Sequence, residues 1–364
     1  MGIRAAGNEA IRHPVRALAQ SPLAVAARRT YLLWRERRGH TAGPEEGGRL
    51  FRAPSYATTC KRPCNDDAMY EGASPMEETR AGARTTVVVM TRNRVRSLAR
   101  TLARLEALPE RPQVIVVDNG SDDGTPILLA HRFQRVKAIV LSENAGPHAR
   151  TLGVEAAHTR YVAFADDDSW WWPGSLAVAE RVFDEHPAVG MLAARTLVGQ
   201  ERLDDPINEV MRRSPLGQDS ALPGPSVLGF LACAAIVRRS AFLEAGGFPE
   251  SVMGFEETPL ALEMARHGWA AVYLDELIAE HHPSPGPERA SRRRSHVHNE
   301  LVFAWRRRPF GTAFARTLSA FRQGLTERAA LGALLDTARQ VPRLRRERNV
   351  VDESLESSLR RLNL

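Results

Sequence analysis

The sequence has little cysteine and no long apolar run. It contains three cysteines in 364 residues, and Cys60 and Cys64 lack a second nearby pair that would complete a zinc site. We therefore expect free thiols in a reducing compartment. The longest apolar run, SVLGFLACAAIV at 226–237, is about half the ~20 residues that cross a bilayer, and the N-terminus has no ordinary signal-peptide pattern. These absences predict a cytoplasmic protein.

Positive charge is scarce in the middle of the chain. The net charge is +7 overall, but it is +5 over residues 1–75, −7 over 76–290 and +9 over 291–364. A nucleic-acid-binding core carries its basic residues where the phosphates lie. The acidic middle therefore predicts that nucleic acid is not a partner. With 43% hydrophobic residues, the chain can bury a core.

The two ends differ in pattern from the middle. Residues 1–83 are rich in Arg, Ala, Gly and Pro and are predicted to form a weakly ordered basic arm. Met76 precedes the first clear strand, so translation from Met76 and a genuine arm are both open. Residues 291–364 are predicted to form a basic helical extension. Two interpretations of that extension are equally good: a solvated helical cap, and peripheral docking at the anionic inner face of the plasma membrane.

Residues 84–290 alternate strand and helix patterns. TTVVVMT, QVIVVDNG, KAIVLSEN and RYVAFADDD have the composition of strands, and helical patterns separate them. Such βαβ units predict a parallel sheet, in which ligands bind beyond the carboxyl ends of the strands. The segments that follow strand ends should gather along one edge, and they are Thr91 to Arg94, Asp118 to Asp123, Asn144 to Gly146 and Asp166 to Asp168.

Three consecutive carboxylates, Asp166, Asp167 and Asp168, end an apolar strand in RYVAFADDDSWWWPGS. Each like charge raises the cost of ionising the next, so a compensating positive charge is expected there. A divalent cation, or a polyanion held by such a cation, would supply it. Acid triplets also occur in solvated turns without a function, but the position at the end of an apolar strand favours a binding site.

With these segments in order, the chain resembles the family 2 glycosyltransferases of the GT-A type. The resemblance covers roughly residues 85–310 and rests on VVVMTRNR, VIVVDNGSDDGT, NAGPHARTLGVEAA, YVAFADDDSWWWPGSL, CAAIVRRSAFLEAGGF, GFEETPLALEMARHGW and HHPS. It implies an α/β fold of GT-A type, with a Rossmann-like, mostly parallel sheet flanked by helices. It also implies inverting transfer of a sugar from a nucleoside-diphosphate sugar to an acceptor hydroxyl on a glycan, a lipid-linked molecule or a small molecule.

The resemblance also implies a divalent cation, Mn²⁺ or Mg²⁺, that stabilises the departing diphosphate. The family's Asp-x-Asp motif maps onto Asp166 and Asp168, with Asp167 contacting the ribose or lying behind the ligands. His282, with His281 beside it, matches the histidine that completes the protein ligands in metal-dependent relatives. Surface and core histidines are common, so the position in the motif order is what favours His282 as a ligand.

Other positions match nucleotide-binding residues of the family. Asp118 would accept a hydrogen bond from a ring N–H of the base, which favours UDP- or TDP-sugars. Further contacts with the nucleotide sugar are implied for Thr91, Asn93, Arg94 and Arg150, although Arg150 also fits an ordinary surface arginine on a helix. Trp170 and Trp171 offer flat faces on which an acceptor sugar could stack, and core packing is the alternative for at least one of the three neighbouring tryptophans.

The family's general base maps onto GFEETPLA. Glu257 takes the base position and Glu256 the preceding one, for which the resemblance implies a contact with the acceptor. The family has Asp where this chain has Glu257, so either glutamate can be the base. An acidic helix N-terminus is favourable without any function, and here the helix is expected to begin with Thr258 as N-cap and to end at Gly268.

Two other functions compete with glycosyl transfer. A sugar-nucleotide pyrophosphorylase has a similar sheet, but it needs a glycine-rich loop after the first strand, and TRNRVRSL has no glycine. A catalytically inactive nucleotide-sugar-binding scaffold would keep the fold. The acid triplet and the glutamate pair together favour the enzyme over the scaffold.

Overall fold

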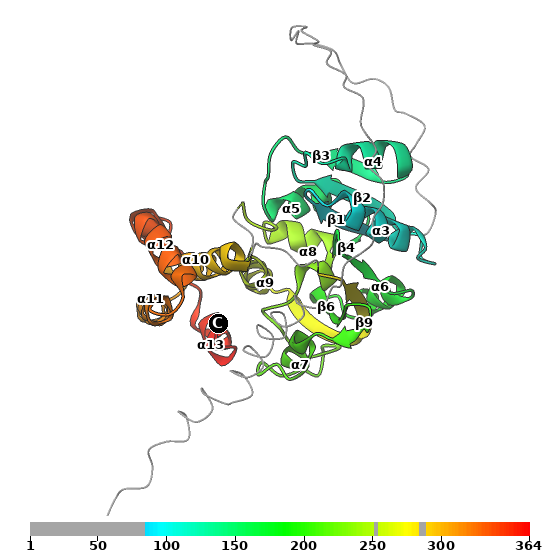
Figure 1. Ribbon diagram of the computed structural model, residues 1–364. Coiled ribbons are helices and arrows are strands. Elements are labelled where there is room, and N and C mark those ends of the chain that lie inside the picture. The colour runs from blue at the N-terminus through cyan, green and yellow to red at the C-terminus, as the bar shows by residue number, and fades with distance from the viewer. Residues whose placement is uncertain (1–83, 251–253, 284–288) are drawn as a thin grey trace, which may run out of the picture.

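The computed structural model describes residues 84–250, 254–283 and 289–364. The predicted N-terminal arm, with Cys60, Cys64 and Met76, lies outside the described residues. Within them, helices pack on both faces of a nine-stranded sheet with the strand order β3-β2-β1-β4-β8-β6-β9-β5 and β7 paired to β6 (Figure 1). The predicted α/β class is therefore confirmed.

The first half of the sheet is parallel and follows the βαβ pattern of the sequence. Strands β2 and β4 both pair with β1, and β3 pairs with β2. The strands are β1 (Thr85–Thr91), β2 (Gln113–Asp118), β3 (Lys137–Val140) and β4 (Tyr161–Asp166), and the helices between them are α3 (Val95–Glu106), α4 (Thr125–Arg132) and α5 (His148–Glu155).

The second half of the sheet is mixed. Strand β8 is antiparallel to β4 and β6, β9 is parallel to β6, and β5 is antiparallel to β9. The strands are β5 (Ser169–Trp171), β6 (Val189–Val198), β7 (Leu203–Asp204), β8 (Ala235–Arg238) and β9 (Ala270–His281). The helices here are α6 (Ser175–Glu185), α7 (Pro206–Arg212), η2 (Ala232–Ala234), α8 (Arg239–Glu244) and α9 (Glu257–Arg266). The end of the long strand β9 thus pairs with β5, the short strand that directly follows β4 and the acid triplet.

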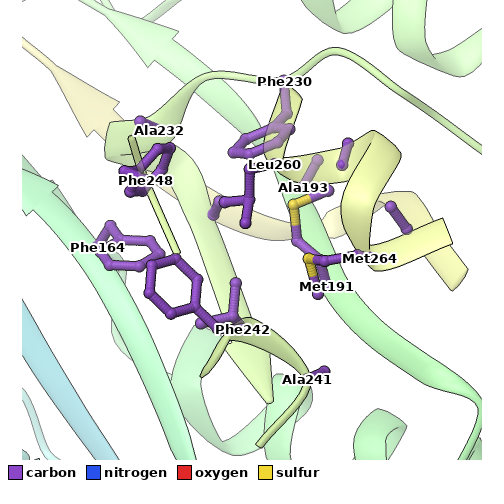
Figure 2. Close-up of a cluster of buried hydrophobic side chains, with 14 of the residues drawn as sticks. Phe164, Met191, Ala193, Phe230, Ala232, Ala241, Phe242, Phe248, Leu260 and Met264 are labelled. Atoms are coloured by element: carbon purple, nitrogen blue, oxygen red, sulfur yellow. The ribbon is translucent and has the colours of Figure 1, made fainter. Parts of the chain in front are cut away.

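The core lies on both faces of the sheet because successive strand residues point to opposite sides. On β1, Val88 belongs to one cluster, and Val87 and Val89 belong to the other. One cluster takes in side chains of α5, α8 and α9, and the other takes in side chains of α3, α4 and α6. Figure 2 shows part of the first cluster, where Phe164 of β4 packs against Phe242 and Phe248.

The helical extension predicted for residues 291–364 is present as α10 (Arg289–Arg307), α11 (Phe310–Gly324), α12 (Arg328–Arg346) and α13 (Glu353–Arg361). Helices α10 to α12 pack together and lie to one side of the sheet, beyond α9 (Figure 1). Phe303 of α10 and Leu359 of α13 join the core cluster of the sheet. Among the described residues, no helix combines the length and the apolar character needed to cross a membrane.

One predicted boundary is wrong. Helix α9 begins at Glu257 with Glu256 in the N-cap position, whereas Thr258 was expected to be the N-cap. The Glu256 carboxylate accepts a hydrogen bond from the backbone N–H of Gly254 at 2.5 Å, so the chain turns before Thr258. The predicted end is confirmed, because Gly268 has φ +81° directly after the helix.

Candidate active site

The carboxyl ends of three parallel strands form the edge at which the candidate residues meet. Thr91 at the end of β1 is in register with Asp118 of β2, and Met90 is in register with Asp166 of β4. The polar residues that follow these strands therefore gather along one edge, as the sequence predicted.

Two arginines lie against the acid triplet. Arg94 donates to Asp168 Oδ2 at 2.9 Å and to Asp167 Oδ1 at 3.4 Å, and Arg150 donates to Asp166 Oδ1 at 2.5 Å. Part of the positive charge that three adjacent carboxylates require is therefore supplied within the chain.

Asp167 is buried and is held by hydrogen bonds from β1 and α3. Its Oδ2 accepts a hydrogen bond from Thr91 Oγ1 at 3.0 Å, and its backbone carbonyl accepts one from Thr101 Oγ1 at 2.8 Å. Burial, followed by the charge of Asp168, raises the pKa of Asp167 to about 7, while Arg94 opposes the rise. Thr91 and Asp167 thus fix the end of β4 against β1 and α3.

Asp118 carries a buried acceptor atom without a partner in the described residues. The residue is fully buried, and Oδ1 accepts a hydrogen bond from the backbone N–H of Ser121 at 3.1 Å. Oδ2 has no hydrogen-bond partner. An unpaired buried acceptor is costly, so Oδ2 is a ready acceptor for a ligand N–H at this edge.

Arg94 also lines an open cavity of about 470 Å³ at the N-terminal end of α3. Its lining includes two further arginines, Arg96 and Arg100. Asn93, also at the cavity, braces two loops, since its backbone N–H donates to Ser121 Oγ and its Oδ1 accepts from the backbone N–H of Asp122. The cavity has the size and the positive charge that suit a phosphorylated ligand.

Arg150 lies deeper than expected for a residue that faces a nucleotide base. Its side chain is 1% exposed, and its Nε and Nη1 are buried without hydrogen-bond partners. Burial acts to lower its pKa, but the charges of Asp166, Glu256 and Glu257 raise the pKa overall. The guanidinium is therefore electrostatically coupled to both the acid triplet and the glutamate pair.

The two glutamates follow a strained turn. Gly254 has φ +115° and Phe255 has φ +68°, a left-handed conformation that a bulky side chain rarely adopts. Burial and the neighbouring charge of Glu256 raise the pKa of Glu257 to about 8. Burial also raises the pKa of Glu256, against the opposing charge of Arg150. The pair therefore holds protons at a pH where ordinary glutamates are ionised.

Helix α10 supports this turn from outside the motifs. Asn299 Nδ2 donates to the backbone carbonyl of Gly254 at 2.6 Å. The Phe255 ring packs edge-on against His296 and against Phe303. Sequence reasoning missed this contact, because the α10 residues belong to none of the motifs.

The histidine whose ring lies beside the acid triplet is His281, whereas His282 donates its backbone N–H to the Asp168 carbonyl at 2.7 Å; the role of His282 as a metal ligand stays a prediction. His281 Nε2 lies 3.5 Å from Asp168 Oδ1. His282 instead places Nε2 3.1 Å from Glu280 Oε2 and stacks on Trp170 with ring centroids 4.4 Å apart. The antiparallel pairing of Ser169 with His281 explains the difference, since neighbouring strand residues point to opposite faces.

The tryptophans do not present free faces for an acceptor. Trp171 is 1% exposed and donates its indole N–H to the Phe164 carbonyl at 3.0 Å, so its predicted stacking role is wrong and the core alternative holds. Trp170 is 6% exposed and is stacked on His282, which leaves little of its face for a sugar. Trp172 is half-buried and donates to Glu280 Oε1 at 2.7 Å.

A comparison with known families identifies the middle of the chain. Residues 86–246 match the family model described as glycosyl transferase family 2. These residues form a family 2 glycosyltransferase domain. The family 2 domain includes every strand-end residue described above, from Thr91 to Asp168, whereas the glutamate pair lies just beyond the matched range.

The chain is also similar to curated proteins. It is 29% identical over 287 residues to the N-acetylglucosaminyl-diphospho-decaprenol L-rhamnosyltransferase of Mycobacterium tuberculosis, covering 67% of this chain and 93% of that protein. It is 31% identical over 205 residues to the pre-mycofactocin glycosyltransferase of the same species, covering 54% of this chain and 42% of that protein.

A solved structure supports the fold. The structure of GalNAc-T7 with UDP, GalNAc and Mn²⁺ matches with a TM-score of 0.51 at 12% sequence identity, covering 78% of this chain and 55% of that one. This likeness concerns the fold alone. Together with the family 2 match, it confirms the predicted GT-A type of architecture.

The family 2 domain contains one buried thiol that sequence reasoning did not single out. Cys233 in η2 is 6% exposed, and burial followed by the charges of Asp166 and Asp168 raises its pKa well above the ordinary value. Its only signal in the sequence is its position in CAAIVRRSAFLEAGGF.

Proposed function

We propose that this family 2 glycosyltransferase transfers a sugar, with inversion, from a nucleoside-diphosphate sugar to an acceptor hydroxyl. One observation carries the proposal: the buried Arg150 is paired with Asp166 and is also under the charge of Glu256 and Glu257. The acids suited to hold a donor and the acids suited to remove a proton therefore interact with the same arginine. Direct displacement needs the donor and the base close together.

The nucleotide lies along the strand-end edge in this proposal. Asp118 Oδ2 is a buried acceptor without a partner in the described residues, and it fits the ring N–H of uracil or thymine. UDP- and TDP-sugars are therefore the favoured donors. Arg94 and the other arginines at the adjacent cavity provide charge for phosphate oxygens.

The residues fit a cation that takes most of its ligands from the donor. Among the described residues, no group of three or more His, Cys, Asp or Glu side chains is arranged to hold a metal ion. Mg²⁺-like ions are commonly held by one or two carboxylates together with substrate phosphates. We propose Asp168, with Asp166 nearby, as those carboxylates and His281 rather than His282 as their neighbour. A bound Mn²⁺ or Mg²⁺ would stabilise the charge of the departing diphosphate.

Glu257 is the proposed general base, with Glu256 as the alternative. A base must be ionised to accept the proton of the acceptor hydroxyl, and a pKa near the working pH suits this task. Burial raises the pKa of Glu257 into that range. Arg150 lies where it can favour the ionised form once the acceptor is bound.

A relative supports one class of acceptor. The chain spans 93% of a rhamnosyltransferase whose name specifies a lipid-linked diphosphate acceptor. We propose a lipid-linked acceptor of the cell envelope for this chain as well, with a glycan or a small molecule as the alternatives.

The test is a thermal-shift panel of UDP, TDP, GDP, CDP and ADP, each with and without Mn²⁺, on the wild type and Asp168→Ala. We expect one nucleotide to stabilise the wild type only with metal and to have no effect on the variant. The matching sugar nucleotides are then tested for turnover. Metal-dependent nucleotide binding without turnover would favour the inactive scaffold, and the absence of any shift would refute the proposed donor site.

A further inference from the structure

An apolar stripe is exposed along helix α11. Its members recur at intervals of three or four residues, which places them on one face of the helix. They are Phe310, Phe314, Leu318, Phe321 and Leu325, with exposed fractions of 54%, 66%, 40%, 50% and 73%. Large apolar side chains this exposed on one helix face mark an interaction surface.

Helix α12 adds to this surface at the turn between the two helices. Leu331 and Leu335 are 45% and 56% exposed and are one helical turn apart. Gly324, at the end of α11, lies close to Leu331. A side chain at position 324 would place its Cβ 3.3 to 3.4 Å from the N, Cα and Cβ atoms of Leu331. We call the five α11 residues together with Leu331 and Leu335 the apolar stripe.

The stripe is not needed to close the helical bundle. The opposite sides of α11 and α12 bury small residues, Ala320, Ala330 and Ala333, against Val297 and Leu301 of α10. That cluster holds the three helices together without any stripe residue. Phe310 also packs against Trp305 of α10 and against the Arg348 guanidinium. The other phenylalanines and leucines of the stripe are therefore free to serve a contact outside the bundle.

The charge around the stripe is strongly positive. Residues 310–346 contain seven arginines and two acidic residues. Exposed arginines near the turn between α11 and α12 include Arg322 and Arg328, and others follow along α12 at Arg339, Arg345 and Arg346. A second copy of the chain, paired through the same surface, would bring these like charges together. An anionic bilayer would instead complement them.

We propose that the apolar stripe docks on an anionic lipid bilayer, with α11 lying in the interface and the arginines contacting lipid headgroups. A helix with phenylalanine and leucine on one face and arginine beside it is typical of interfacial binding. Each arginine near an anionic surface adds to the attraction, and salt screens it. This inference is independent of the proposed sugar transfer, because the binding can be measured without turnover.

The experiment is vesicle flotation with the full-length protein. Vesicles of phosphatidylcholine alone are compared with vesicles of equal parts phosphatidylcholine and phosphatidylglycerol. The test variant is Phe314→Ser/Phe321→Ser/Leu325→Ser. The matched control is Ile127→Ser, since Ile127 on α4 is also 66% exposed but lies far from α11 in the sequence and outside the helical bundle.

We expect the wild type and the control to float with the anionic vesicles at about 50 mM salt and to be released at about 500 mM. The triple variant should bind at least about tenfold more weakly, since three large apolar side chains no longer enter the interface. Because its substitutions are exposed, its melting temperature should match that of the wild type.

Three results would overturn the proposal. One is failure of the wild type to bind anionic vesicles at low salt, and another is equal binding by the triple variant. The third is a dimer, seen by light scattering, that the triple variant abolishes while the wild type binds no vesicles; a second copy would then occupy the stripe.

Discussion

Replacing Glu257 with glutamine should abolish turnover and, at alkaline pH, stabilise the protein. Glutamine keeps the size of the side chain but cannot accept the proton or carry the charge. Positioned general bases contribute about 10²–10⁴ to the rate, so we expect Glu257→Gln to lower kcat by about a thousandfold. The gain in stability arises because the wild type must ionise a carboxyl group that its surroundings keep protonated.

The sign and size of the stability effect follow from the pKa. The pKa of Glu257 is about 8, against an ordinary value of 4.5. Its contribution to stability is therefore fully present below pH 4.5 and is lost as the pH rises through 8. At about 1.4 kcal/mol per pKa unit, the upper limit of this loss is about 5 kcal/mol. Glu257 is only half-buried and is coupled to Glu256, so we expect about 2 kcal/mol.

The assay is thermal unfolding of the wild type and Glu257→Gln across pH. A gain of about 2 kcal/mol corresponds to a melting temperature higher by about 4–8 °C at about pH 9, and the difference should nearly vanish at about pH 5. Glu106→Gln, at an exposed position at the end of α3, is the control and should change neither quantity. The reasoning fails if Glu257→Gln keeps turnover within tenfold of the wild type. It also fails if the melting temperatures stay parallel across pH. Loss of turnover in Glu256→Gln alone would assign the base to Glu256.

Three further substitutions test other parts of the site. Arg150→Ala should lower the free energy of unfolding by about 3–5 kcal/mol, since it removes the buried half of the ion pair with the partly exposed Asp166; a smaller loss in urea unfolding would mean that the ion pair is well solvated. Asp118→Asn should weaken binding of the preferred nucleotide about tenfold to a hundredfold in calorimetry, because a charge-assisted hydrogen bond is lost, and unchanged affinity would place the base elsewhere. Trp171→Ala should cost about 3–5 kcal/mol of stability through the cavity it leaves, and a variant with normal stability but a raised acceptor KM would restore the stacking role.

The strand-end edge could be predicted because it depends on local signals. Alternating strand and helix patterns indicate a parallel sheet, and a parallel sheet brings its strand ends together. Thr91, Asp118 and Asp166 therefore meet as expected. The pairing of β5 with β9 depends instead on a contact between residues more than a hundred positions apart. A one-residue change in such a register exchanges the faces of a strand, so the sequence alone could not decide which of the two histidines has its ring beside Asp168.

The helical extension contacts the turn that carries the glutamate pair. A bulky residue in a left-handed conformation costs about 1–3 kcal/mol, and Phe255 adopts it directly before the glutamate pair. The compensating contacts come from α10, through Asn299 to Gly254 and through His296 and Phe303 to the Phe255 ring. The same helix packs against α11 and α12, which carry the apolar stripe. The proposed lipid-docking surface and the turn before the proposed general base are thus joined by one helix, so docking at a bilayer would hold the glutamates at a fixed distance from the membrane, as the proposed lipid-linked acceptor requires.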